Sequence, residues 1–292
     1  MSKSLLGTYL RFLRSPNLSA PPITIAKHKA VKSILCLYSV HLIALLILLV
    51  IIGQIPAAQD SNNLLDALTD SPVWYLPVMA IIVAPLLEEC IFRLPLRAFA
   101  LNLLLPVSLV ISVSLGWVAP GGLGFVAIAL VNVYLGIKGT KLTKLQAFYN
   151  KFPHVIFYGI ALLFGVIHIT NYDFDVWKFL PVLVLPQIVI GLLLGFVRLR
   201  YGFVWGFLLH ALHNGALLLP VTFVQLFGSK QLQANLTESI DLETLSRADQ
   251  IVAGAVGLYS VAGILLCAVI AWKVVREWIH ISNYDTNTGT RL

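Results

Sequence analysis

Two adjacent carboxylates and an arginine lie within a long apolar stretch, and they are the first residues of the chain that could do chemistry. The stretch covers residues 73–98 and contains Glu88, Glu89 and Arg93. On a helix, Glu89 and Arg93 share a face with the acid first, which is the favourable order for an ion pair. Glu88 points about 100° away around the helix. A buried ion pair that only fixes helix packing would not need this second acid.

Further polar residues interrupt two later apolar runs. His168 follows Phe164 at helical spacing, and His210 precedes Asn214 at the same spacing, with His213 one helical step from Asn214. A single buried histidine is more often a hydrogen-bonded core residue than part of a site. A charge near the middle of a membrane costs at least about 2.5 to 3.5 kcal/mol, so the combination of acids, arginine, histidines and asparagine indicates one functional site.

Two chemistries could use these side chains. Glu88, His168 and His210 could hold zinc with one position open for water. Alternatively, Glu88 activates a water molecule with help from a histidine, while His210 and Asn214 donate hydrogen bonds to a developing oxyanion. The HExxH signature of zinc proteases is missing from the sequence. We therefore favour water activation without a cofactor, with zinc as the lesser alternative.

Membrane-spanning helices must position these residues, because the chain is too apolar for a soluble domain. It has 292 residues, of which 59% are hydrophobic and 11% are charged, whereas about a quarter of the residues in soluble domains are charged. The formal net charge is +7, but the basic residues are scattered between apolar runs. This distribution argues against nucleic acid as a partner and indicates contact with membrane lipids.

Eight apolar runs predict an all-α membrane bundle of about eight transmembrane helices, since each span needs roughly 20 mostly apolar residues. The runs cover residues 34–53, 73–98, 101–119, 123–137, 153–169, 177–197, 203–223 and 251–272. The fourth run is short, so seven spans with a re-entrant segment are the alternative. The expected divisions are a basic amphipathic N-terminal segment (1–33), a transmembrane domain (34–275) and a polar C-terminal tail (276–292).

The basic residues also predict the orientation of the chain. With eight spans and the N-terminus inside, all but three of the 20 basic residues fall in inside segments, the exceptions being Lys178, Lys230 and Arg247. Basic residues are enriched in cytoplasmic segments of membrane proteins. Both termini are therefore expected in the cytoplasm, with the N-terminal segment lying on the membrane surface.

In order along the chain, the polar residues match three motifs of a known family. The sequence resembles the CAAX protease and bacteriocin-processing family, also called the type II CAAX prenyl endopeptidase or ABI family, whose motifs are EExxxR, FxxxH and HxxxN or HxxxD. These motifs begin at Glu88, Phe164 and His210, and the glycine-punctuated stretch before the third, with Gly202 and Gly206, is also similar. The resemblance covers roughly residues 73–219 and implies a core of about eight helices.

The resemblance implies a role for each matched residue. These roles are a general base, an arginine that orients the acids, a histidine that assists the water, an oxyanion hole and a supporting acid. The resemblance assigns the general base to Glu88, the orienting role to Arg93 and the assistance to the water to His168. It assigns the oxyanion hole to His210 with Asn214, and the supporting acid to Glu89.

The expected function is therefore an intramembrane endopeptidase that cleaves a peptide or lipidated peptide near the cytoplasmic face. Two other functions fit part of the pattern. A non-proteolytic immunity or interaction protein would keep the fold without needing Glu88. A proton-coupled transporter would also use intramembrane acids and histidines, although the sequence shows neither repeat halves nor paired broken helices.

One geometric conflict arises from counting residues along the spans. At about 1.5 Å per residue from the basic ends, His210 lies about 10 Å deep, Glu88 about 15 Å and His168 about 20 Å. If His168 lay that close to the outer face, the three side chains could not form one site.

Overall fold

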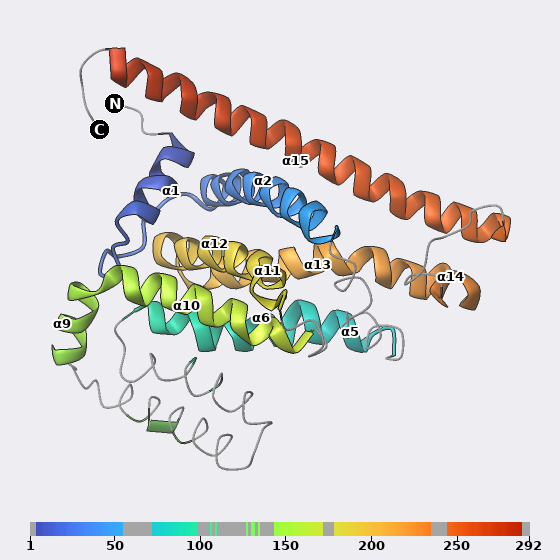
Figure 1. Cartoon of the computed structure of the whole chain (residues 1–292), viewed down its shortest axis with the longest axis horizontal. Helices are drawn as coiled ribbons and strands as arrows, with labels where there is room; N and C mark the ends of the chain where they lie inside the picture. The colour runs from blue at the N-terminus through green and yellow to red at the C-terminus, as the bar shows by residue number, and fades with distance from the viewer. Residues whose placement is uncertain are drawn as a thin grey trace.

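The computed structural model of the chain is a bundle of helices (Figure 1). It describes residues 4–54, 72–97, 143–171, 178–234 and 244–287, with a few isolated helical positions between 98 and 142. Within these residues every element is a helix. The predicted all-α class is therefore confirmed for this part of the chain.

The described elements follow one another along the chain as helices of different lengths. In order, they are α1 (Leu5–Arg14), α2 (Lys27–Ile52), α5 (Tyr75–Pro77), η1 (Val78–Val83), α6 (Ala84–Glu88), η2 (Glu89–Arg93), η3 (Leu94–Leu96), α9 (Thr143–Lys151), α10 (Pro153–Ile167), η4 (His168–Asn171), α11 (Leu180–Leu183), α12 (Leu185–Tyr201), α13 (Phe203–Phe227), α14 (Lys230–Ala234) and α15 (Arg247–Asn287). The elements η1 and η2 are π-helices, and η3 and η4 are 3-10 helices.

Four of the described helices are long and apolar enough to cross a membrane. They are α2, the continuous stretch Leu180–Tyr201 that includes α12, α13, and residues Arg247–Ser282 of α15. The apolar helix α10 is shorter, and the predicted span 73–98 is divided among several elements. The predicted runs 101–119 and 123–137 fall on residues outside the described ranges. The number of eight spans therefore stays a prediction.

Two spans are longer than the apolar pattern predicts. Helix α2 begins at Lys27 instead of residue 34, and α15 continues to Asn287 instead of residue 272. With 41 residues, α15 is about 60 Å long, twice the thickness of about 30 Å of a bilayer hydrocarbon core. The basic residues that flank these apolar runs therefore belong to the same helices, which continue beyond the apolar part of the membrane.

Helix α12 lies at the centre of the bundle and packs against α2, α10 and α13. Its side chains Leu193, Leu194 and Val197 are fully buried. At the edge of the bundle, α15 instead exposes large apolar side chains, among them Leu258 and Leu265 (Figure 1). An apolar outer surface is what a helix surrounded by lipid requires, and the protein is accordingly an integral membrane protein.

The N-terminal helix α1 packs part of its apolar face on the bundle, and its location at the membrane surface stays a prediction. Leu6 and Tyr9 are buried, and the Tyr9 hydroxyl donates to His41 Nε2 of α2 at 2.9 Å. Phe12 packs edge-on against Phe196 of α12. Helix α1 also contacts α15, which brings the start and the end of the described chain to the same end of the bundle (Figure 1).

The helix that carries the two acids is interrupted twice by π-helical segments. The segments η1 and η2 lie on either side of the short helix α6. Such segments widen the helix locally and are frequent at functional sites. After η2 the chain tightens into the 3-10 helix η3, which contains Pro95, and becomes extended at Arg97. The apolar pattern of residues 73–98 predicts one continuous span, but its prolines, such as Pro85 at the start of α6 and Pro95 in η3, lack a backbone N–H and are a signal for an interrupted helix.

Candidate active site

Glu88 and Glu89 lie where α6 meets the π-helix η2. Helix α6 ends at Glu88, and η2 begins at Glu89. The side chain of Glu89 is completely buried, whereas that of Glu88 is 25% exposed. Two neighbouring carboxylates therefore have different surroundings, as is common where two acids perform different tasks.

An ion pair and a histidine hold Glu89. Arg93 Nε lies 3.4 Å from Glu89 Oε1, and both side chains are fully buried. Nδ1 of His210, on α13, lies 3.1 Å from the same carboxylate oxygen. The Arg93 guanidinium carbon is also 4.3 Å from the centre of the Phe164 ring, which is a cation–π distance. The ion pair predicted from the spacing is therefore confirmed.

Two glycines allow α13 to approach this buried pair. Gly202 joins α12 to α13 with a φ of 108°, a backbone conformation that residues with a side chain rarely adopt. A Cβ added to Gly206 would lie 2.9 Å from Glu89 Oε2, which is too close for an unstrained contact. The first glycine therefore permits the turn, and the second leaves room for the carboxylate.

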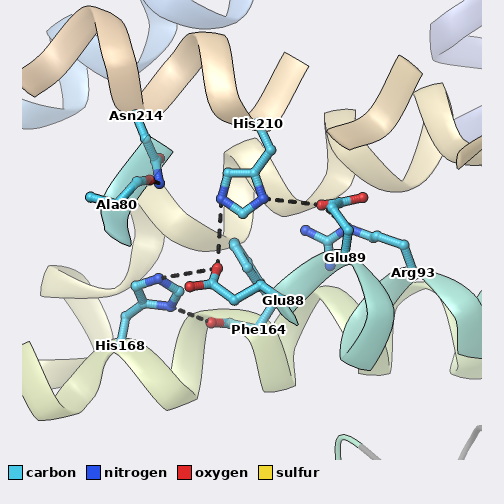
Figure 2. A network of polar contacts seen from close by, with 8 residues as sticks. All are labelled: Ala80, Glu88, Glu89, Arg93, Phe164, His168, His210 and Asn214. Carbon is cyan, nitrogen blue, oxygen red and sulfur yellow. Dashed lines mark hydrogen bonds and ion pairs between the residues drawn. The ribbon is translucent and has the colours of Figure 1, made fainter. Parts of the chain in front are cut away.

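Glu88 faces two histidines that come from other helices (Figure 2). Its Oε2 lies 4.0 Å from His168 Nε2 and 3.6 Å from His210 Nε2. Both distances exceed those of direct hydrogen bonds, and Glu88 Oε2 accepts no hydrogen bond from the residues that the structure describes. The three side chains thus converge from α6, η4 and α13 with a small separation between their polar atoms.

The partner of Nδ1 in each ring determines whether the Nε2 that faces Glu88 carries a proton. His168 Nδ1 lies 2.7 Å from the carbonyl oxygen of Phe164, and His210 Nδ1 lies beside the Glu89 carboxylate. Both partners accept hydrogen bonds, so Nδ1 carries the proton in each neutral ring. Each ring therefore directs an unprotonated Nε2 towards Glu88. A donor such as water fits between these three acceptors.

The depth difference between His168 and Glu88 that residue counting gives is wrong, because the structure places the two side chains within ion-pair distance. Helix α10 begins at Pro153 and ends directly before His168, while the helix that carries Glu88 contains two π-helical segments. Counting from the basic ends assumes that all helices start at one level and rise evenly. Neither assumption holds, and the predicted conflict disappears.

Asn214 lies one turn after His210 and contacts the first π-helix. Its Nδ2 donates to the carbonyl oxygen of Ala80 in η1 at 2.8 Å (Figure 2). His213, in contrast, lies away from the acids, with Nδ1 3.2 Å from the Tyr38 hydroxyl on α2. The structure therefore brings the acids, Arg93, His168 and His210 into contact, while Asn214 contacts η1 one turn further along α13 and His213 contacts α2.

The described residues contain no group of three or more His, Cys, Asp or Glu side chains arranged to hold a metal ion. Glu88, His168 and His210, the ligands expected if zinc is bound, are neighbours, but their polar atoms are separated by the distances given above.

Arg198 also lies next to the site. From the sequence it is predicted only to be one of the basic residues at the inner end of a span. Its Nε donates to the carbonyl oxygen of Arg93 at 3.3 Å. The residue occupies the last turns of the buried helix α12, where a charged side chain needs a polar partner. That placement is the signal from which its contact could have been predicted.

Comparison with known proteins yields one match. The family model described as type II CAAX prenyl endopeptidase Rce1-like matches residues 70–216, which is about half of the 292 residues. The matched segment contains all three motifs and every predicted site residue. No curated protein and no solved structure matches the chain.

Proposed function

Because the chain belongs to the Rce1-like family of type II CAAX prenyl endopeptidases, we propose that it is an intramembrane endopeptidase in which Glu88 activates the attacking water. The substrate is a membrane-associated peptide or lipidated peptide, which reaches the polar site within the apolar bundle from the cytoplasmic side. Membrane lipids surround the bundle, and no cofactor takes part.

The position of Glu88 is the observation that carries this proposal. A general base must reach both water and substrate, and Glu88 is partly exposed, whereas Glu89 is buried against Arg93. His168 Nε2, which is unprotonated in the neutral ring, lies 4.0 Å from Glu88 Oε2. A water molecule among these atoms has an acceptor for each hydrogen, which leaves an oxygen lone pair free to attack a carbonyl carbon.

In the proposed reaction, the water gives one proton to Glu88 as its oxygen bonds to the carbonyl carbon of the substrate. His168 Nε2 accepts the other hydrogen bond of the water and sets the direction of attack. Glu88 then passes its proton to the amine nitrogen as the C–N bond breaks. The same carboxylate thus serves first as general base and then as general acid.

His210 and Asn214 stabilise the negative oxygen of the tetrahedral intermediate in this proposal. Donation from His210 Nε2 requires a second proton on the ring, and the Glu89 carboxylate beside Nδ1 stabilises that charge. One Asn214 amide hydrogen binds Ala80, so the other can reach the oxyanion. Arg93 holds the Glu89 carboxylate in place.

Cleavage of a library of membrane-tethered peptides tests the proposal. Wild type is compared with Glu88→Gln, which keeps the size of the side chain but not the base, each with and without a strong chelator. Glu277→Gln makes the same change on the exposed part of α15 and is the control. We expect Glu88→Gln to slow cleavage by about 10² to 10⁴, and the chelator and the control to have no effect.

Each other outcome has a separate meaning. Cleavage retained by Glu88→Gln removes Glu88 as the base. Cleavage that the chelator abolishes and added zinc restores identifies a metalloprotease with Glu88, His168 and His210 as ligands. A wild type that cleaves no member of the library contradicts the endopeptidase proposal.

A further inference from the structure

Two arginines connect the end of the acid-bearing helix to the end of α12, and each donates to a carbonyl group of the other segment. Arg198 Nε, on α12, donates to the carbonyl oxygen of Arg93 at 3.3 Å. In return, Arg97 Nη2 donates to the carbonyl oxygen of Leu199 on α12 at 2.8 Å. We call this pair of contacts the arginine clamp.

The clamp meets a need that the backbone creates at this point. Arg93 is the last residue of the π-helix η2, and the 3-10 helix η3 with Pro95 follows. Carbonyl groups at the end of a helix lack some of their partners within the helix, and the next N–H along the chain, that of Arg97, donates to Leu94 instead of Arg93. Arg198 supplies an additional donor to the Arg93 carbonyl and thereby ties the end of η2 to α12.

Arg198 also borders the pocket of Glu89. A Cβ on Gly206 would lie 2.9 Å from Glu89 Oε2 and 3.8 Å from Arg198 Cβ. The carboxylate and the stem of Arg198 therefore both touch the same point of α13. Because His210 lies on that helix and contacts Glu89, a shift at this point changes the distance between the acids and the histidine.

Arg97 extends the clamp to the N-terminal segment. Its Nη1 lies 3.2 Å from the carbonyl oxygen of Leu18 and 2.6 Å from that of Ala20. Ile23 N donates to the carbonyl oxygen of Arg200 at 2.8 Å. The connection after α1 is thus fastened to the same turn of α12 that holds the acid-bearing helix.

We propose that Arg198, together with Arg97, is a positioning residue that places Glu88 and Glu89 against His168 and His210. This inference rests on the proposed function, because it assigns the arginines to the geometry of the same site. Neither guanidinium acts on the substrate. Both act through the backbone of η2 and of α12.

Steady-state cleavage by Arg198→Met measures the effect. Methionine keeps an unbranched apolar stem but has no N–H donor. We expect kcat to fall about 100-fold, since a displacement of about 1 Å caused far from the chemistry has a cost of this size, while KM stays unchanged. Arg198→Lys keeps a donor, so it should recover most of kcat.

The control is Arg200→Met, which removes the same charge two residues later. The Arg200 guanidinium lies 6.0 Å from the Tyr201 ring. Among the described residues it forms no hydrogen bond or ion pair with η2, so kcat should be unchanged. In the double variant Arg97→Met/Arg198→Met, the loss should be smaller than the product of the two single losses, because both residues hold one joint. A wild-type kcat in Arg198→Met, or an equal loss in Arg200→Met, overturns the proposal.

NMR of the imidazole nitrogens of the full-length protein, with isotope-labelled histidine, gives a readout that needs no substrate. The His210 Nδ1 signal, assigned with His210→Gln, reports the contact with Glu89. It should shift in Arg198→Met and stay in place in Arg200→Met. A shift without any cleavage by wild type refutes the proposed function alone, whereas an unshifted signal in Arg198→Met refutes the positioning role.

Discussion

Replacing Arg93 with methionine would leave Glu89 as a buried carboxylate without its arginine. The two side chains are completely buried and lie 3.4 Å apart. Removing one member of a buried ion pair costs about 3 to 5 kcal/mol. His210 Nδ1, 3.1 Å from the same carboxylate oxygen, keeps its hydrogen bond to Glu89 and offsets part of this cost. We therefore expect a loss near the lower end of that range.

Thermal unfolding in detergent, followed by tryptophan fluorescence, measures this loss. A change of about 3 kcal/mol corresponds to about 6 to 12 °C for a chain of this size class. The double variant Glu89→Gln/Arg93→Met removes both charges and should recover most of the lost stability, since neutral replacements of a buried pair are often tolerated. Arg200→Met is the control for loss of one positive charge.

The results that would refute this reasoning are specific. If Arg93→Met unfolds within about 2 °C of wild type, the pair is not desolvated as its burial indicates. If the double variant is less stable than Arg93→Met, the stranded carboxylate is not the cause of the loss. Lost packing of the guanidinium on Phe164 would then explain it instead.

Three other predictions address the packing and the topology. Gly206→Ala places a methyl group 2.9 Å from Glu89 Oε2 and should cost about 1 to 3 kcal/mol in the same unfolding assay, whereas Gly263→Ala, with open space around its Cβ, should cost nothing. Asn214→Leu leaves the Ala80 carbonyl without its donor and should cost about 1 to 3 kcal/mol; a smaller loss than in Gly263→Ala would contradict it. Protease-cleavable tags at the two termini should be cut from the same face of sealed vesicles, and cutting from opposite faces would contradict an even number of spans.

The spacing of charged residues was sufficient to predict the central contact of the site. Glu89 and Arg93 form the ion pair that a helix requires of residues at this spacing. The order of the three motifs also indicated which spans meet, and the structure brings Glu88, His168 and His210 together. Such contacts can be predicted because they depend on the spacing of residues within one helix or on the types of residue in a motif.

The details that sequence could not supply depend on contacts between distant segments. The π-helix η1 has an apolar sequence like that of any span, and the donor to its Ala80 carbonyl is Asn214 on α13. The relative height of two helices likewise depends on how they dock. Amphipathic spacing in α1 predicts an apolar face, but the same spacing fits a lipid surface and a protein surface equally well.

The position of α1 has a consequence for the biogenesis of the protein. Helix α1 is synthesised well before α12 and α15, yet Tyr9 packs against Phe196 of α12 and the helix also contacts α15. Its apolar face therefore lacks these protein partners until they are made, and its basic amphipathic character suits temporary residence on an anionic membrane surface. Docking of α1 is accordingly a late assembly step, which must wait until both α12 and α15 have been inserted.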